Sequence, residues 1–169
     1  MSRIPKRIKV TLNNIDKAIR ELEEYRAWFI EKTRELTEAL ALVGAKEAAH
    51  WFGTAIYDGD NDVSVEVVAK DDGSGWIIRA SGQAVAFIEF GTGRYYNPNE
   101  PYPAPRPAGI VGIGEYGHKQ GRKQGWVYRE ADGAKTFTRG NPPAMAMYRA
   151  NEKMKDDIIE IAREVFSRR

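Results

Sequence analysis

Hydrophobic residues in the first third of the chain recur at helical spacing. After two asparagines that can cap a helix, apolar side chains follow at intervals of three, four and seven residues from Ile15 to Val43. Charged side chains occupy the opposite face of this helix. The pattern predicts a long helix that ends at Gly44 and a shorter helix over 45–57, so that residues 13–57 are largely helical.

Shorter segments alternate between apolar and polar residues with the period of a β-strand. Residues 8–12 predict a short strand before the first helix, and residues 63–67 predict a second strand. An Asp/Gly turn joins the latter to 76–80, which predicts a hairpin. The apolar, alanine-containing run 84–90 is compatible with helix or strand, and we assign 63–93 as a whole to strands and a glycine-rich turn.

The composition changes sharply after this turn. Five of the eight prolines lie within 98–107 and eight of the sixteen glycines within 109–140, which predicts a long extended loop over 94–125. Residues 126–138 predict a second hairpin around an Ala-Asp-Gly turn. A C-terminal helix over 142–167 follows, capped by an asparagine and begun by two prolines.

These elements predict a single α+β domain spanning residues 1–169. We expect a mostly antiparallel sheet of about four to five strands, packed against the long N-terminal helix and the C-terminal helix. A chain of this length buries roughly 70% of its unfolded surface, and its 42% hydrophobic content suffices for a core. No run of apolar residues is long enough to span a membrane, so we expect no membrane partner.

The sequence offers little catalytic or metal-binding chemistry. Cysteine is absent and the two histidines are 68 positions apart, which excludes thiolate sites and a cluster of histidines. Residues 112–117 match the dinucleotide-binding letters Gly-x-Gly-x-x-Gly but follow a proline-rich loop rather than a strand. Asp58, Asp60 and Asp62 match the start of a calcium loop whose later ligands are missing. We therefore expect no cofactor, no metal and no catalytic residues.

Glu89 is the best carboxylate candidate for chemistry, because Ile88 and Phe90 flank it. A buried glutamate can act as a general acid, and a small enzyme centred on Glu89 is one alternative. The structural interpretation is favoured, in which Glu89 accepts hydrogen bonds from amides of the glycine-rich turn or pairs with an arginine.

Charge is balanced overall but unevenly distributed. The formal net charge is +2, whereas residues 106–123 carry a net +3. Aromatic residues in the long loop suggest that it orders against a partner. The candidate assembly interface is therefore Tyr95, Tyr96, Tyr102, Arg106 and Tyr116, and the candidate DNA-facing residues are Lys119, Arg122 and Lys123. An alternative function is a nucleic-acid-binding module over 106–128, which would also use Trp126 and Tyr128.

The run Glu89-Phe90-Gly91-Thr92-Gly93 resembles the Glu-Phe-Gly-Thr-Gly signature of a bacteriophage and prophage family of neck and tail-completion proteins. This family is named after the gene-ten product of phage HK-ninety-seven. The order of predicted elements is also similar, with Gly140–Ala150 at the place of the family's proline-initiated C-terminal helix. Ala144 and Met145 stand where family members often have an aromatic residue.

The resemblance implies a structural virion protein at the head–tail junction of a tailed phage. It implies assembly in the bacterial cytoplasm as a ring, with a hexamer as the expected form, and contact with other neck, connector and tail proteins. Genomic DNA would pass through the ring and touch it non-specifically. Under this interpretation residues 89–93 form a structural turn, and the protein is not an enzyme.

Overall fold

The computed structural model describes residues 12–57, 59–91, 125–130, 132–138 and 140–167. Its elements are α1 (Leu12–Thr54), β1 (Ser64–Ala69), β2 (Trp76–Ser81), α2 (Val85–Phe90), β3 (Trp126–Arg129), β4 (Lys135–Thr138) and α3 (Ala146–Ser167). The α+β class, the long N-terminal helix and the C-terminal helix are confirmed. Within the described part of the chain, no helix is both long and apolar enough to cross a membrane.

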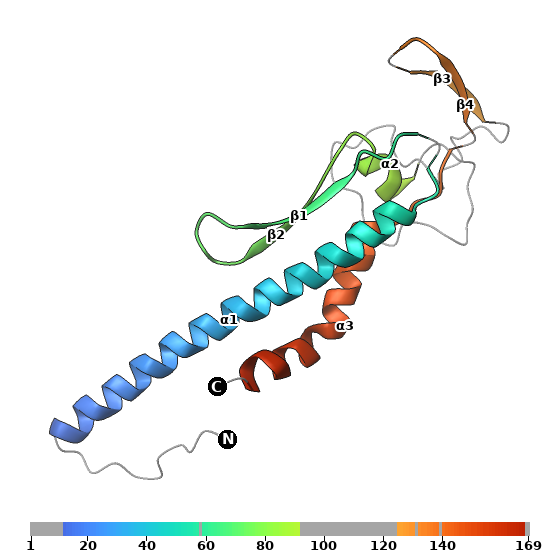
Figure 1. Cartoon of the computed structure of the whole chain (residues 1–169). Helices are drawn as coiled ribbons and strands as arrows, with labels where there is room; N and C mark the ends of the chain where they lie inside the picture. Colours follow the sequence, from blue (N-terminus) through green and yellow to red (C-terminus); the bar gives the residue numbers. More distant parts are fainter. Residues whose placement is uncertain (1–11, 58, 92–124, 131, 139, 168–169) are drawn as a thin grey trace.

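Helix α1 is continuous over 43 residues, about 64 Å, and extends beyond the other labelled helices and strands (Figure 1). The predicted helix end at Gly44 is wrong, because this glycine serves packing instead. A Cβ at Gly44 would lie 2.6 Å from both Ile78 Cδ1 and Met154 Sδ, so the missing side chain allows β2 and α3 to approach α1 closely. Leu12, predicted to end a strand, belongs to α1, and residues 8–11 of that strand lie outside the described residues.

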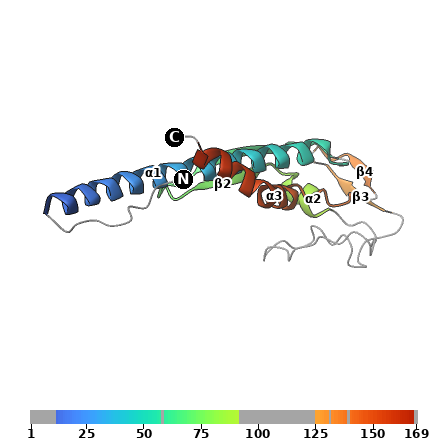
Figure 2. The ribbon, with the colours of Figure 1, turned by 90° about the horizontal axis from the view of Figure 1, so that it is seen from below.

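The four strands form two separate antiparallel pairs rather than one larger sheet. β1 pairs with β2, and β3 pairs with β4, so both predicted hairpins are confirmed. The β1–β2 hairpin lies along α1, whereas the β3–β4 hairpin projects beyond the C-terminal end of α1 in both ribbon views (Figures 1 and 2). The prediction of a single sheet of four to five strands is therefore wrong for the described residues.

Residues 85–90, which we assigned to a strand, form the short helix α2. The Asp62 carboxylate accepts hydrogen bonds from the backbone N–H groups of Gln83 at 2.6 Å and Ala84 at 2.9 Å. These donors immediately precede Val85, the first residue of α2, so the two bonds hold the backbone in place where the helix starts. Asp62 therefore helps to begin a helix where the apolar pattern alone did not decide between helix and strand.

Helix α3 begins at Ala146, four residues later than predicted. Before it, the chain runs alongside the end of α2. The backbone N–H of Ala144 donates to the Ile88 carbonyl at 2.8 Å, and the N–H of Met145 donates to the Glu89 carbonyl at 3.2 Å. These bonds hold the preceding residues outside the helix, and Met145 adopts a φ of 57°.

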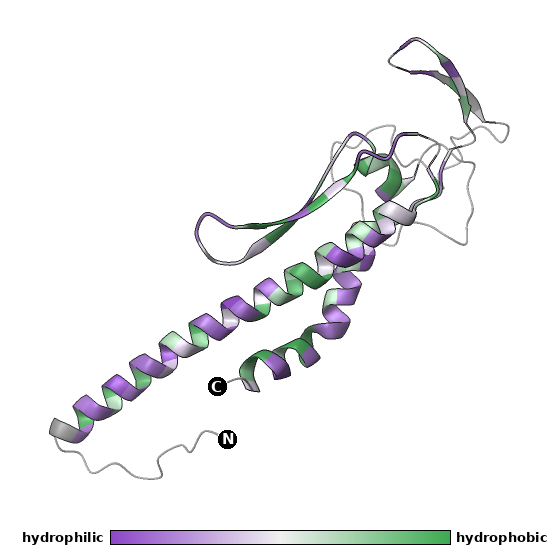
Figure 3. Ribbon diagram, viewed as in Figure 1, coloured by the Kyte–Doolittle hydropathy of each residue, from purple (hydrophilic) through white to green (hydrophobic). Residues whose placement is uncertain are grey.

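The core lies where α1, α2 and α3 meet. Its fully covered residues include two large side chains, Phe52 and Ile88, packed among alanines of α1 and α3 and the alanine that precedes α2: Ala48, Ala146, Ala150 and Ala84. Small residues let α1 and α3 approach closely, as in other crossed helix pairs. Figure 3 shows that hydrophobic residues nevertheless recur on α1 far from this core, on its free N-terminal half.

Two aromatic contacts extend the α1–α3 packing in opposite directions. Toward the N-terminal half of α1, the ring of Phe166 lies 5.8 Å from those of Trp28 and Phe29. At the other end of α3, the Arg149 guanidinium lies 3.9 Å from the centre of the Trp51 ring. The described part of α3 thus reaches α1 only as far as Trp28 and Phe29, and residues of α1 before them extend beyond it.

Candidate functional site

Glu89 is 3% exposed and faces the first turn of α3. Its Oε2 accepts a hydrogen bond from the backbone N–H of Met147 at 2.8 Å, and its Oε1 accepts one from the N–H of Tyr148 at 3.2 Å. Met147 and Tyr148 are the second and third residues of α3, the positions whose amides a capping side chain ordinarily serves. Glu89 therefore caps α3 from another helix.

This capping from a distance has a local cause. The residue before α3 is Met145, whose side chain has no oxygen to accept the free amides. A carboxylate at a helix N-terminus also interacts favourably with the helix dipole. As predicted, Glu89 accepts hydrogen bonds from backbone amides, and the donors Met147 and Tyr148 belong to α3, whereas Thr92 and Gly93 of the predicted turn lie outside the described residues.

Gly91 brings the end of α2 against the segment that precedes α3. Its φ of 75° and ψ of 174° fall in a region that only glycine adopts readily. A Cβ there would lie 2.7 Å from the Asn141 carbonyl oxygen and 2.8 Å from the Pro143 nitrogen. Phe90, beside it, is buried. Glu89, Phe90 and Gly91 therefore form one packed junction with residues 141–148, here called the Glu89 junction.

Most other candidate residues from the sequence lie in 92–124, outside the described residues. They are Thr92 and Gly93, the assembly candidates Tyr95, Tyr96, Tyr102, Arg106 and Tyr116, and the DNA-facing candidates Lys119, Arg122 and Lys123. The Gly-x-Gly-x-x-Gly match at 112–117 lies there too. Trp126 and Tyr128 are in β3, next to this segment.

The three aspartates of the partial calcium motif do not form a described cluster. Asp58 is outside the described residues, and Asp62 is engaged with the amides before α2. Those two amide hydrogen bonds, from Ala84 first and then Gln83, hold the pKa of Asp62 below its ordinary value. Among the residues that the structure describes, no group of three or more His, Asp or Glu side chains is placed to hold a metal ion.

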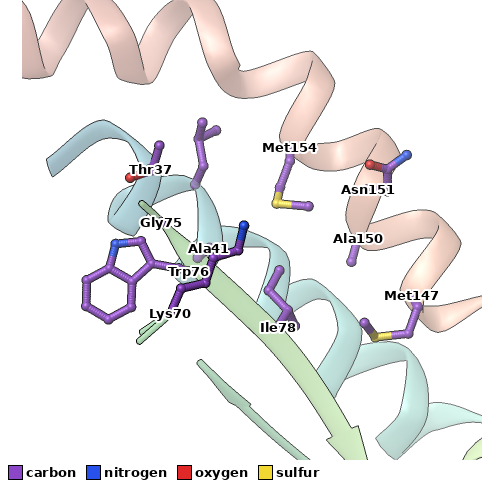
Figure 4. A pocket seen from close by; sticks show the side chains of 11 residues that line it. Thr37, Ala41, Lys70, Gly75, Trp76, Ile78, Met147, Ala150, Asn151 and Met154 are labelled. Atoms are coloured by element: carbon purple, nitrogen blue, oxygen red, sulfur yellow. The ribbon is translucent and has the colours of Figure 1, made fainter. Parts of the chain in front are cut away.

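An apolar cavity of about 460 Å³ lies between α1, β2 and α3. In the close view of Figure 4, the Met154 side chain points into it from α3, and Ile78 lies on the β2 side. The other labelled lining residues include Ala41 from α1 and Ala150 from α3. The described residues that line the cavity include no cluster of polar groups suited to chemistry, and its volume is in the range of small-ligand sites.

A second groove of about 430 Å³ lies on the side of α1 and has a different character. It shares Trp76 with the apolar cavity, so the two hollows adjoin. Its lining combines apolar and acidic groups: Ala27, Ile30, Trp76, Glu31, Glu35 and Glu38, together with Arg34. We call it the acidic groove.

Sequence reasoning missed both hollows, because residues of distant elements build them. It also missed how much apolar surface remains exposed on the free half of α1. Exposed fractions there range from 40% to 66% over Ile15, Ile19, Leu22 and Tyr25. These residues continue the helical stripe that is covered by α3 further along, and exposed patches of this kind commonly mark contact surfaces.

In comparison with known proteins, no family model matches this chain, and neither a curated protein nor a solved structure matches it significantly.

Proposed function

We propose that this protein is a structural component of a tailed phage or prophage, a neck or tail-completion protein that acts by assembling at the head–tail junction. Copies of the protein would contact one another to form a ring, and the ring would bind neighbouring connector and tail proteins. The expected form of the ring is a hexamer, and genomic DNA would pass through it. The proposal assigns no catalytic reaction to Glu89 or to any other residue.

The Glu89 junction is the observation that carries the proposal. Two segments suggested the resemblance to the phage family: the Glu-Phe-Gly-Thr-Gly run and Gly140–Ala150. They are about fifty residues apart in sequence, yet Glu89 hydrogen-bonds to Met147 and Gly91 packs on Pro143. The described residues of the two segments thus pack together as one structural unit, which supports interpreting them as parts of one motif.

The exposed surfaces also favour assembly over chemistry. The buried carboxylate that a small enzyme would need is already engaged by amides of α3. In contrast, the free half of α1 and the β3–β4 hairpin project from the core with large apolar side chains exposed (Figure 1). Projecting elements of this kind suit contacts between subunits, because a ring subunit needs surfaces beyond its own core.

Deletion of the gene from an inducible phage or prophage tests the proposal. Electron microscopy of the induced lysate should show filled heads and separate tails, and a plasmid copy of the gene should restore complete particles. Normal infectious particles from the deletion strain would contradict the proposal. Arrest before DNA packaging would instead indicate a role in building the head.

A further inference from the structure

One face of the β3–β4 hairpin combines an apolar pair with a basic pair. Val127 lies directly opposite Phe137, and Arg129 lies directly opposite Lys135. Because side chains two residues apart along a strand share a face, all four project from the same side. Val127 and Phe137 are each 56% exposed, and Arg129 and Lys135 are also exposed.

This arrangement is unfavourable for the hairpin on its own. Like charges directly opposite each other on neighbouring strands destabilise the pairing, and neither Arg129 nor Lys135 has an ion-pair partner within the described ranges. Two exposed apolar side chains beside them add a cost in water. An acidic surface with an apolar patch would relieve both costs.

The acidic groove on α1 has these properties. Ile30 is 51% exposed and lies with Trp76 in the groove lining, next to Glu31 and Glu38. Lys32 neutralises Glu35 at 2.8 Å, whereas neither Glu31 nor Glu38 takes part in an ion pair among the residues described. Arg34 is the one base in the groove lining against three acids, so the lining is net acidic. Its two unpaired acids and its apolar residues match the two unpaired bases and the apolar pair of the hairpin.

The two surfaces of one chain cannot meet each other. The groove lies around residues 27–38 of α1, about 25 Å or more along the helix axis from its C-terminal end at Thr54. The hairpin projects beyond that same end in both ribbon views (Figures 1 and 2). A contact between hairpin and groove therefore needs a second copy of the chain.

We propose that the Val127/Phe137 face of the β3–β4 hairpin docks into the acidic groove on α1 of a second copy, with Arg129 and Lys135 paired to Glu31 and Glu38. Since the two surfaces differ, the contact is head-to-tail and leaves a free hairpin at one end and a free groove at the other. Repetition of such a contact gives a closed ring or an open filament. The inference deepens the proposed function, on which its biological meaning rests, but the contact itself can be tested without a phage.

Disulfide cross-linking tests the contact directly, because the natural chain has no cysteine. The double variant Phe137→Cys/Ile30→Cys, oxidised as the folded full-length protein, should give a ladder of disulfide-linked oligomers on a non-reducing gel. Phe137→Cys/Ile159→Cys is the matched control, because Ile159 is 63% exposed on α3 and outside the groove. A ladder no stronger than that of the control would overturn the proposal.

The second test measures self-association by sedimentation velocity in variants whose charges are reversed. Arg129→Glu/Lys135→Glu and, separately, Glu31→Lys/Glu38→Lys should each weaken self-association about tenfold or more, and the chain with all four substitutions should recover most of it. Lys46→Glu/Arg163→Glu, with the same change in net charge at exposed helical positions, should leave association unchanged. Circular dichroism melting checks that each variant is folded.

Two further outcomes would overturn the proposal. They are a wild-type chain that stays monomeric and self-association that is insensitive to the charge exchange. If the lysate experiment supports the head–tail role while the cross-link fails, the subunits join through another face. If the cross-link succeeds while the phage is normal, the contact is real and the proposed function is wrong.

Discussion

The Glu89 carboxylate lies 2.8 Å from the backbone nitrogen of Met147 and joins α2 to the first turn of α3. A residue 58 positions earlier in the chain thereby does what a serine or aspartate before the helix ordinarily does. Since Glu89 is only 3% exposed, these hydrogen bonds replace bonds to water that its carboxylate would otherwise make. This interaction makes the start of α3 depend on α2.

Substitution of Glu89 should therefore destabilise the fold without any change in packing volume. Glu89→Gln keeps the size of the side chain but removes its charge. One carboxylate oxygen is replaced by an NH2 group, which cannot accept a hydrogen bond from a backbone N–H. We expect a loss of about 1–3 kcal/mol in the free energy of unfolding, measured by urea titration. Glu24→Gln, at an exposed position of α1, should change it by less than about 0.5 kcal/mol. Equal effects of the two substitutions would contradict the capping role.

Gly91→Ala should destabilise the chain for two reasons, the unfavourable backbone conformation and the approach to Asn141 and Pro143. Together these should cost about 2–4 kcal/mol in unfolding free energy. Gly73→Ala is the matched control, because Gly73 has a φ of 66° but an added Cβ meets nothing within 4 Å. Its cost should be about 1 kcal/mol from backbone strain alone. A Gly91→Ala chain as stable as the control would contradict the close packing at the Glu89 junction.

Asp62 should make stability depend on pH in acid. Its pKa is lowered in the folded chain by the amides of Ala84 and Gln83, so its contribution is fully present above the ordinary value of 3.8. As the pH falls through the lowered pKa, the carboxyl group is protonated and the contribution is lost. Thermal melting of wild type and Asp62→Asn should differ at pH 7 and converge once the pH has fallen below the lowered pKa of Asp62.

The exposed Asp60→Asn substitution is the control for this experiment and should follow wild type throughout. A difference between wild type and Asp62→Asn that persists unchanged at the lowest pH would show that the side chain acts through something other than its charge.

The contact between Arg149 and Trp51 should contribute modestly to the packing of α1 on α3. With the guanidinium 3.9 Å from the ring centre, a coupling free energy of about 0.5–1 kcal/mol is expected at this partly exposed site. A double-mutant cycle with Arg149→Met and Trp51→Leu measures it by chemical denaturation. Strictly additive losses would show that the two side chains do not interact.

The sequence predicted those elements whose signals are local. The Ala-Asp-Gly turn and its alternating flanks placed β3 and β4 at their observed residues, and the helical stripe from Ile15 onward placed α1. The errors arose where contacts distant in sequence decide the outcome. Gly44 looked like a helix end because its packing against Ile78 and Met154 cannot be read from its neighbours.

Contacts between residues distant in sequence also explain why the partners of Glu89 could not be predicted. Flanking residues suggested that Glu89 is buried, and it is, but nothing near it in sequence identified Met147 and Tyr148 as its partners. Likewise, Asn141 and its two prolines resemble a helix start. Because Ala144 and Met145 hydrogen-bond to α2, the helix begins only at Ala146. Tertiary hydrogen bonds here override a strong local signal.

Addition of purified protein to a phage lysate tests the assembly role most directly. A lysate from the gene-deleted phage, containing filled heads and free tails, should gain infectious titre when wild-type protein is added. The Arg129→Glu/Lys135→Glu protein should restore far less titre, although it is folded. A deletion lysate that is already fully infectious, or one whose heads and tails stay separate after wild-type protein is added, would contradict the account.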